Sequence, residues 1–298
     1  MSRRADSIRE MALKLPDELL RFCQMSPERA AWLDRLPDLV EKSMRQWSLS
    51  LDRPLDGEEA SCSFLSAVRR ENGTPAVLKI GMPHMEAEDE IKGLRFWNGV
   101  PTVRLLASED ELGAMLLERC SPGTTLRALP EVEQDAIIAT LLFRLWRRPA
   151  FPFEFRPLSA MIEHWSKKTL AQSQSWPDPE LVHEGLRLFQ DLARDVSDQV
   201  LLATDLHAGN VLRAEREPWL VIDPKPFLGD PAYDATQHLL NCFARLQSDP
   251  VGTIQSLSNL LGVDAERVRL WTFTRLAAEP RSDWRNPEKL SLARSILS

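Results

Sequence analysis

Two short apolar runs lie close together in Ala203-Thr-Asp-Leu-His-Ala-Gly-Asn-Val-Leu212 and Trp219-Leu-Val-Ile-Asp-Pro-Lys225. A polar break that contains Pro218 separates them, which predicts a β-hairpin. Residues just outside the paired strands of a hairpin lie opposite each other. We therefore expect Asn210 and Asp223 to meet at one end of this hairpin, with Asp205 on the loop that leads into it.

This arrangement would gather two carboxylates and an amide oxygen in one small volume. Hard cations such as Mg²⁺ prefer oxygen ligands of this kind. Phosphoryl transfer requires an acid beside such a metal site, to accept or orient the proton of the attacking hydroxyl. The stretch is therefore a candidate centre for phosphoryl transfer.

Composition places the chain among ordinary globular proteins. Its 298 residues allow two domains or two large lobes, and 43% of them are hydrophobic and 27% charged. The formal net charge of -7 argues against a nucleic-acid partner and permits a cationic one. No apolar run reaches the length of a membrane span, and the N-terminus shows no signal peptide.

Cysteine and glycine patterns exclude several other classes. The four cysteines are widely spaced and form no CxxC pair, so we expect free thiols in a reducing cytoplasm rather than a zinc site or a disulfide framework. Neither GxGxxG nor GxxxxGK[ST] occurs, which argues against dinucleotide-binding and P-loop folds.

The N-terminal part alternates between helical and strand patterns. We expect two short helices before residue 47, with Pro27 and Pro37 in first turns. The expected strands and the single expected helix follow, at residues 47–51, 61–69, 75–80, 83–98 (the helix), 103–107 and 114–118. This part would form a small five-stranded antiparallel lobe.

After a linker at residues 120–125, helical periodicity dominates. The expected helices cover residues 129–147, 158–170, 180–200, 233–246, 253–261, 265–278 and 287–297. The sequence therefore predicts an α+β fold with two lobes. Residues 1–119 would form the nucleotide-binding lobe, and residues 120–298 a larger, mainly helical lobe that holds the catalytic and acceptor-binding groups.

The order of these parts resembles the aminoglycoside phosphotransferase family of the protein-kinase-like fold, within it the branch of streptomycin 6-kinases and hydroxyurea-type resistance kinases. The matching pieces are Val77-Leu-Lys-Ile80, Glu90, Leu116-Leu-Glu-Arg-Cys120, Asp205-Leu-His-Ala-Gly-Asn-Val-Leu212, Val221-Ile-Asp-Pro-Lys225 and Gly229-Asp-Pro-Ala-Tyr-Asp234. The resemblance implies ATP and Mg²⁺ as cofactors. It also implies an antibiotic-inactivating kinase as the function.

The catalytic roles follow from this resemblance and from the chemistry of phosphoryl transfer, which is mostly positioning and charge neutralisation. Asp205 would accept or orient the proton of the attacking hydroxyl. Asn210 and Asp223 would hold Mg²⁺ on the nucleotide phosphates. Lys79 would contact the α- and β-phosphates and be held by Glu90.

Other expected nucleotide contacts are less tied to one residue type. Main-chain N–H groups from Gly57 onward and the hydroxyl of Ser61 would cover the phosphates, although Gly57 also suits an ordinary turn. Main-chain groups near Glu118 and Cys120 would meet the base, and Cys120 also suits a small apolar hinge position. Lys79, in turn, could simply extend its amine to water from an apolar strand.

Asp230 and Asp234 are candidates for acceptor binding. Carboxylates favour a guanidinium- or amine-bearing sugar through charge-assisted hydrogen bonds. The alternative is that the two residues cap a helix. His207 is expected to tie the loop by hydrogen bonds rather than to act as a base.

Two departures from the family pattern affect these expectations. Ala203 and Thr204 stand where the family has His-Gly before the acid, so the bracing of the loop differs. Pro224 and Lys225 follow Asp223 instead of Phe-Gly, and no long activation segment follows, which argues against a regulated protein kinase.

The leading hypothesis is an ATP-dependent kinase that phosphorylates a hydroxyl of a streptomycin-like aminoglycoside, a small cationic acceptor, in a monomer or homodimer without nucleic-acid or membrane partners. Alternatives are a kinase for another small hydroxyl or amine metabolite, a non-catalytic nucleotide-binding module, or a metal-dependent phosphoesterase. The last would use Asp205, His207 and Asp223 as metal ligands. The acceptor, the choice of ATP over GTP and the oligomeric state stay open at this stage.

Overall fold

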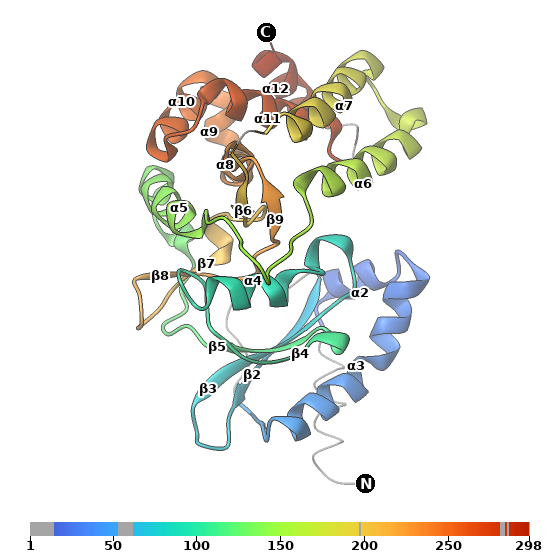
Figure 1. The fold of residues 1–298 in the computed structure, drawn as a ribbon. Helices are drawn as coiled ribbons and strands as arrows, with labels where there is room; N and C mark the ends of the chain where they lie inside the picture. The colour runs from blue at the N-terminus through green and yellow to red at the C-terminus, as the bar shows by residue number, and fades with distance from the viewer. Residues whose placement is uncertain (1–14, 53–61, 197, 281–283, 285, 298) are drawn as a thin grey trace. The chain divides into compact units, whose positions relative to one another are not determined.

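The computed structural model describes residues 15–52, 62–196, 198–280, 284 and 286–297. The chain divides into two compact units, Met1–Gly123 and Thr124–Ser298 (Figure 1). The first contains one larger sheet and the second is mainly helical. The predicted α+β fold class is confirmed by these elements.

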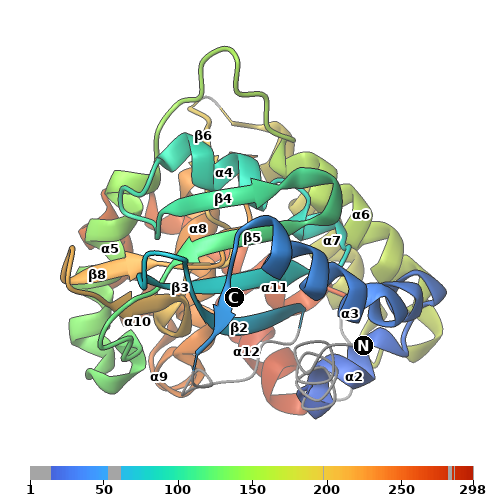
Figure 2. The ribbon, with the colours of Figure 1, turned by 90° about the horizontal axis from the view of Figure 1, so that it is seen from below.

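The first unit is built on a five-stranded antiparallel sheet, as predicted (Figure 2). Its strands are β1 (Ser50–Leu51), β2 (Ser63–Arg69), β3 (Pro75–Gly81), β4 (Leu105–Glu109) and β5 (Ala114–Glu118), in the spatial order β1-β2-β3-β5-β4. The turn between β2 and β3 follows from its sequence. Asn72 Oδ1 accepts a 3.0 Å hydrogen bond from the Thr74 N–H, and Gly73 takes a positive φ of 79°.

Among the described residues of this unit, three α-helices accompany the sheet: α2 (Asp17–Cys23), α3 (Pro27–Gln46) and α4 (Glu90–Trp97), with short 3₁₀ turns η1 (Met85–Ala87) and η2 (Asp110–Leu112). The apolar stripe of α3, which includes Trp32, Leu36 and Val40, belongs to the same buried cluster as the sheet residues Leu78 and Ile80. This shared core is what fixes the helix on the sheet.

The expectation for Pro37 was wrong. Only Pro27 occupies a first turn, where Ser26 caps the helix, whereas Pro37 lies inside the 20-residue helix α3. An interior proline removes one main-chain hydrogen bond. The burial of Leu36 and Val40 on either side of Pro37 keeps the helix continuous despite that loss.

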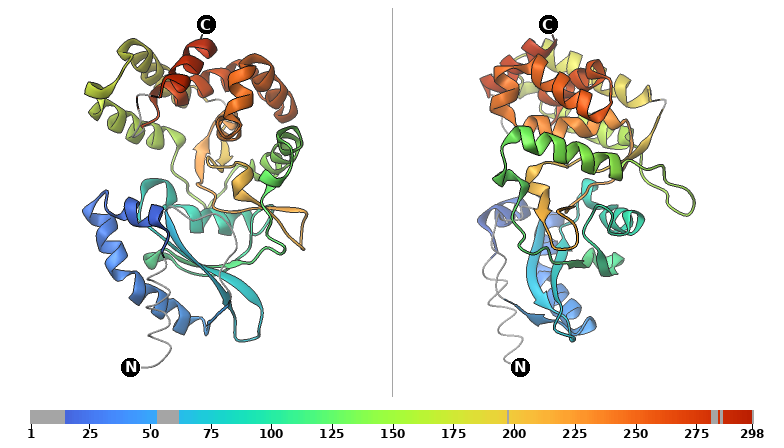
Figure 3. Two further views of the ribbon diagram at one scale, coloured as in Figure 1. Left: turned by 180° about the vertical axis from the view of Figure 1, so that it is seen from behind. Right: turned by 90° about the vertical axis from the view of Figure 1, so that its left-hand side faces the viewer.

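The second unit contains eight α-helices among its described residues. They are α5 (Glu131–Leu145), α6 (Leu158–Ala171), α7 (Pro179–Arg194), α8 (Pro231–Asn241), α9 (Phe243–Ser248), α10 (Pro250–Leu261), α11 (Ala265–Ala278) and α12 (Pro287–Leu297) (Figure 3). Helix α11 is buried along most of its last two turns and packs against α7, α8 and α12. It is the central helix of this unit.

Two of the helix predictions need correction. Helix α7 ends at Arg194, not at residue 200, because Val200 already begins a strand. The segment expected as one helix at residues 233–246 is two, since the main chain leaves helical geometry at Cys242.

Four short strands of the second unit flank the segments that carry Asp205, Asn210 and Asp223. The predicted hairpin forms from β7 (Val211–Arg213) and β8 (Trp219–Val221), and a second pair joins β6 (Val200–Leu202) to β9 (Phe227–Gly229), which the sequence did not predict. The part of this unit that the structure describes also has the 3₁₀ turns η3 (Leu126–Ala128), η4 (Ser173–Ser175) and η5 (Ala208–Asn210). The candidate loop runs from β6 through η5 into β7.

Candidate active site

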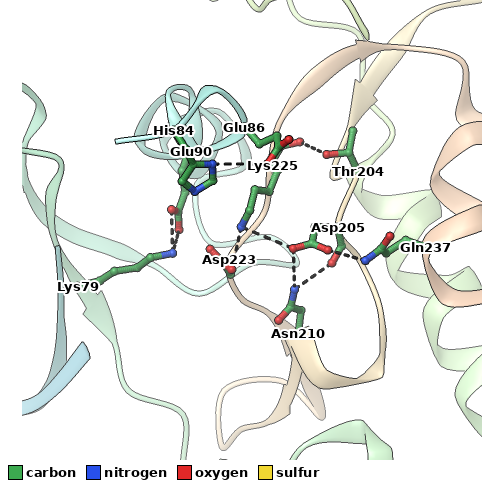
Figure 4. A network of polar contacts seen from close by, with 10 residues as sticks. All are labelled: Lys79, His84, Glu86, Glu90, Thr204, Asp205, Asn210, Asp223, Lys225 and Gln237. Atoms are coloured by element: carbon green, nitrogen blue, oxygen red, sulfur yellow. Dashed lines mark hydrogen bonds and ion pairs between the residues drawn. The ribbon is translucent and has the colours of Figure 1, made fainter. Parts of the chain in front are cut away.

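Asp205 lies on the loop between β6 and β7, and its carboxylate has several partners (Figure 4). Gln237 of α8 donates a 2.6 Å hydrogen bond from Nε2 to Asp205 Oδ1. Asn210 donates from Nδ2 to the Asp205 main-chain oxygen at 2.9 Å and lies 3.5 Å from Oδ2. The side chain still keeps 30% of its surface exposed, so the carboxylate is oriented but accessible.

The hairpin brings Asn210 to the strand end that precedes Asp223. Val211 pairs with Val221, and the Ile222 N–H donates to the Asn210 carbonyl at 2.9 Å. Asp223 is the next residue, with a positive φ of 52° and a 35% exposed side chain. The expected meeting of these side chains at the hairpin end therefore agrees with the local pairing.

Lys225 is a member of this group to which the sequence pattern assigned no role. Its Nζ lies 2.8 Å from Asp223 Oδ2 and 3.6 Å from Asp205 Oδ2, and its side chain is only 11% exposed (Figure 4). One ammonium group thus lies between two carboxylates. A lysine two residues after an acid is a weak sequence signal, because only the fold of the loop directs its amine back.

The ionisation of Asp205 is set by its surroundings. Burial raises the pKa of its carboxyl to about 6, and the nearby charge of Asp223 acts in the same direction, whereas the ammonium of Lys225 opposes them. A carboxylate with a pKa near 6 is a stronger base than an ordinary one and is still mainly ionised at neutral pH. These are the properties of a general base.

Asp234 braces the start of this loop. Its carboxylate accepts hydrogen bonds from the main-chain N–H groups of Ala203 (3.0 Å) and Thr204 (2.8 Å) and from Trp146 Nε1 (2.9 Å). The Thr204 hydroxyl donates to the Lys225 carbonyl at 2.6 Å, and the Lys225 N–H donates to the Ala203 carbonyl at 2.9 Å. These bonds hold the loop where the family pattern would place a histidine.

The same bonds explain a strained position. Thr204 has a positive φ of 48°, which a β-branched residue rarely adopts. Such strain persists only where the surrounding contacts define the conformation. Here the Thr204 N–H and hydroxyl are both held by hydrogen bonds, to Asp234 and to the Lys225 carbonyl.

Asp230 and Asp234 do not have the environment of acceptor-binding residues. Asp234 is 1% exposed and its oxygens are occupied as described. Asp230 is 4% exposed, caps α8 through the Ala232 N–H, and accepts from Arg267 Nε (2.6 Å) and Trp271 Nε1 (2.8 Å). The helix-capping alternative describes Asp230.

His207 has the structural environment that was expected of it. Its Nδ1 accepts a 3.0 Å hydrogen bond from the Gly209 N–H. Burial lowers the pKa of the ring to about 4, and the positive charge of Arg127 adds to this shift. The ring is therefore neutral at physiological pH, and it caps η5.

In the first unit, Lys79 and Glu90 form a buried ion pair. Lys79 lies on β3 and Glu90 opens α4, and the lysine Nζ donates to the two carboxylate oxygens at 2.6 and 2.8 Å. Both residues are less than 5% exposed, at 4% and 3%. The pair fixes the amine at the strand instead of leaving it to extend into water.

Of the other residues expected to contact the nucleotide, the structure describes Glu118 and Cys120. Gly57 and Ser61 lie outside the described residues. Glu118 closes β5, where its N–H donates to the Arg104 carbonyl and its Oε2 accepts from the Arg104 N–H. Cys120 is half-buried just after that strand and forms no disulfide.

The oxygen-rich hairpin end suits a hard cation. Among the described residues no group of three or more His, Cys, Asp or Glu side chains is arranged to hold a metal. Asn210 and Asp223 offer one amide and one carboxylate, the type of set on which Mg²⁺ completes its shell with water and substrate phosphates. Because Asn210 Nδ2 donates to the Asp205 carbonyl, its Oδ1 is left as an acceptor. The residues present therefore fit this ion.

A strand-rich unit with a buried lysine–glutamate pair, followed by a helical unit with an acid-bearing loop and an Asn/Asp pair, defines a phosphotransferase of the protein-kinase-like fold. The chain matches the family model of aminoglycoside/hydroxyurea antibiotic resistance kinases over residues 47–283. It belongs to this family, as the resemblance in its motifs indicated.

Two relatives cover most of the chain. A streptomycin 6-kinase from Streptomyces glaucescens is 37% identical over 260 residues, which are 84% of this chain and 83% of the relative. A hydroxyurea phosphotransferase from Kitasatospora aureofaciens is 32% identical over 282 residues, 92% of this chain and 80% of the relative. Both are kinases or phosphotransferases by name.

Solved structures agree on the fold. The choline kinase LicA from Streptococcus pneumoniae superimposes with a TM-score of 0.62 at 14% identity, covering 88% of this chain and 99% of that one. At this identity the likeness concerns the fold. In the described part of the chain, no helix is long and apolar enough to cross a membrane.

Proposed function

We propose that this chain is an ATP-dependent kinase that transfers the γ-phosphoryl group to a hydroxyl of a small cationic acceptor, with streptomycin-like aminoglycosides as the leading class. The observation that carries the proposal is the accessible Asp205 carboxylate, oriented by Gln237 and close to the ammonium of Lys225. The identity to the streptomycin 6-kinase supports the acceptor class.

Asp205 would take the proton of the acceptor hydroxyl. Its Oδ1 is held by Gln237, which leaves Oδ2 as the atom that faces the reacting hydroxyl. The raised pKa of this carboxyl suits it to receive a proton as the oxygen attacks the phosphorus. The leaving group is ADP, so the overall reaction converts ATP and the alcohol into ADP, the phosphate ester and a proton.

The remaining residues would hold the nucleotide. Lys79, oriented by Glu90, would contact the α- and β-phosphates. Main-chain groups near Glu118 and Cys120 would meet the base. Asn210 and Asp223 would bind Mg²⁺, which when bound neutralises phosphate charge.

Lys225 would serve the transferred group. A phosphoryl group in transit spreads negative charge over its oxygens, and fixed positive groups stabilise it without reorganisation. The Lys225 ammonium is anchored through its own main chain to Ala203 and Thr204, so it is held in place beside Asp205. We therefore propose it as a cation for the γ-phosphoryl oxygens.

The test is an assay of Mg²⁺-dependent ATP loss with streptomycin, other aminoglycosides, hydroxyurea and small amino alcohols, and with product identified by mass spectrometry. ATP should be consumed only when an acceptor is present. The Asp205→Asn variant should lose at least about 100-fold in rate, the scale of general-base catalysis. Asp249→Asn, at the exposed cap of α10, is the matched control.

Three results would count against parts of the proposal. Equal ATP loss with and without acceptor, or full activity in Asp205→Asn, would show that Asp205 is not the base of an acceptor-phosphorylating kinase. Turnover of an amino alcohol but of no aminoglycoside would show that the acceptor is not an aminoglycoside, while the assignment as a kinase would stand. Turnover of hydroxyurea alone would favour the second candidate, a hydroxyurea kinase, which the 32% identity to that relative supports.

A further inference from the structure

A cavity of about 580 Å³ lies in the second unit, away from the Asp205 carboxylate itself. Its walls come from η3, the first turn of α5, the turn η5 and the end of α8. The residues that line it are Arg127, Leu129, Pro130, Glu131, Gln134, Ala208, Asn241 and Cys242. Nothing in the roles assigned so far uses this space.

Gln134 presents an unused acceptor to this cavity. The residue is only 6% exposed, and its Nε2 donates a 2.7 Å hydrogen bond to the Leu129 carbonyl. Because a carbonyl oxygen can only accept a hydrogen bond, the amide atom that faces Leu129 is the nitrogen Nε2. The remaining amide atom of Gln134 is therefore the acceptor Oε1. No hydrogen bond to that oxygen occurs within the described chain, and the oxygen is not fully buried, so water or a ligand can reach it.

Asn241, an exposed residue at the end of α8, has the same bonding pattern. Its Nδ2 donates to the Gln237 carbonyl at 2.9 Å, which leaves Oδ1 as an acceptor without a partner in the described chain. Glu131 adds a carboxylate, 41% exposed and 3.3 Å from Arg245 Nε. The cavity is therefore lined by amide and carboxylate oxygens that can receive hydrogen bonds.

Two further side chains of the lining can donate hydrogen bonds, the Arg127 guanidinium and the Cys242 thiol. The Arg127 guanidinium packs closely on η5: a Cβ atom added to Gly209 would lie only 2.8 Å from it. Burial raises the pKa of the Cys242 thiol to about 12, so it stays neutral and donates weakly. A ligand rich in hydrogen-bond donors is the complementary partner.

The wall behind the cavity is held rigidly. Asp135, beside Gln134 on α5, accepts from Arg245 Nη1 and Nη2 at 2.8 Å each and lies 2.8 Å from His238 Nε2. These contacts tie α5 to α8 and α9. The Gln134 amide is thus fixed before any ligand arrives, which lowers the entropy cost of binding.

The cavity adjoins the proposed catalytic acid through two elements. Ala208 follows Asp205 by three residues on the same loop. On α8, Gln237 and Asn241 are four residues apart and so share one helix face, about 6 Å apart along the axis. Gln237 holds the Asp205 carboxylate, while Asn241 lines the cavity.

We infer that this cavity is an acceptor subsite, which binds a ring bearing hydroxyl and amino or guanidino groups while a hydroxyl elsewhere on the same molecule lies at Asp205. Gln134 Oε1, Asn241 Oδ1 and the Glu131 carboxylate receive its hydrogen bonds, and Leu129 and Pro130 contact its apolar face. The inference rests on the proposed function. It explains how a single acid on a short loop selects a large, donor-rich acceptor.

The experiment is calorimetric titration of streptomycin into the full chain without nucleotide, followed by steady-state kinetics. Gln134→Met and Asn241→Leu keep side-chain size and remove the acceptor oxygens. Each should weaken the Kd and raise the KM for streptomycin roughly tenfold, the effect of one lost hydrogen bond. The Kd for Mg-ATP and kcat should stay within about twofold.

Gln255→Met is the matched control, because Gln255 lies on the exposed side of α10 and bonds only Asn259 among the contacts described for it. It should change neither constant. An unaltered streptomycin Kd in both Gln134→Met and Asn241→Leu would overturn the subsite. Equal weakening of Mg-ATP binding would overturn it too, since that points to a general loss of structure.

The design separates the subsite from the proposed function. Streptomycin binding that depends on Gln134 and Asn241, without any turnover, would support the subsite and remove the kinase proposal. Turnover of streptomycin that neither variant affects would do the reverse. If the chain phosphorylates hydroxyurea and binds no streptomycin, the subsite is wrong and the kinase stands.

Discussion

Gln237 of α8 donates a 2.6 Å hydrogen bond to Asp205 Oδ1, across 32 residues of sequence. The acid is therefore oriented by a helix and not only by its own loop. Helical side chains are held more rigidly than those of loops, so α8 fixes Oδ1 of Asp205, and Oδ2 is the oxygen that lies 3.6 Å from Lys225 Nζ.

Replacing Gln237 by leucine should lower kcat about tenfold with little change in the KM for ATP. The physical reason is that one hydrogen bond to a charged group contributes about 1.5 kcal/mol or slightly more, and here it orients the base. Steady-state kinetics with the best acceptor measures this, with Gln255→Leu as the exposed control. A rise in the KM for ATP at unchanged kcat would show that Gln237 acts elsewhere.

Activity should decline in acid with an apparent pKa near 6. Burial raises the pKa of Asp205 to about 6, and the reaction needs the ionised carboxylate. Below that pH the protonated fraction grows, so kcat/KM for the acceptor should fall about tenfold per pH unit. A pH–rate profile from pH 4.5 to 8 measures it, and a flat profile down to pH 5 would contradict the role of this acid.

Replacing Lys225 by methionine should lower kcat about 100-fold, the typical effect of removing one group that stabilises transition-state charge. It should also move the acid limb to higher pH, because the Lys225 ammonium opposes the rise in the Asp205 pKa. Lys225→Arg should recover part of the rate. The prediction fails if Lys225→Met and Lys225→Arg lose the same activity, or if the acid limb moves to lower pH.

Replacing Asp234 by alanine should lower the free energy of unfolding by about 2–3 kcal/mol. The substitution leaves the main-chain N–H groups of Ala203 and Thr204 and the Trp146 indole without partners in a buried site. Urea denaturation followed by circular dichroism measures the change. Asp264→Ala, an exposed helix cap, should lower it by only about 1 kcal/mol, and equal losses would contradict the brace.

The sequence predicted those parts of the site that depend on neighbours in the chain. The β7–β8 hairpin formed as expected because its two apolar runs and its polar turn lie within a dozen residues, and Asn210 followed from that pairing. The Lys79–Glu90 pair was also expected, and it spans only 11 residues between a strand and the next helix.

The parts that the sequence did not predict depend on longer separations. Strands β6 and β9 have three residues each and pair across 25 or more residues, so neither shows a periodic pattern. The partners of Asp234 lie 30, 31 and 88 residues away, and no local pattern distinguishes a brace from a substrate ligand. That is why the sequence left Asp234 as a candidate for acceptor binding or for a helix cap, whereas in the structure it is a buried brace.

The Asp234 brace has a consequence for how activity is lost. Its carboxylate joins the end of α5, the start of the acid-bearing loop and α8, so the loop cannot take its strained geometry until both helices have docked. Local fraying that spares this junction would leave the acid in place. Catalytic competence of this unit is thus coupled to its cooperative folding, and inactivation by denaturant should coincide with global unfolding instead of preceding it.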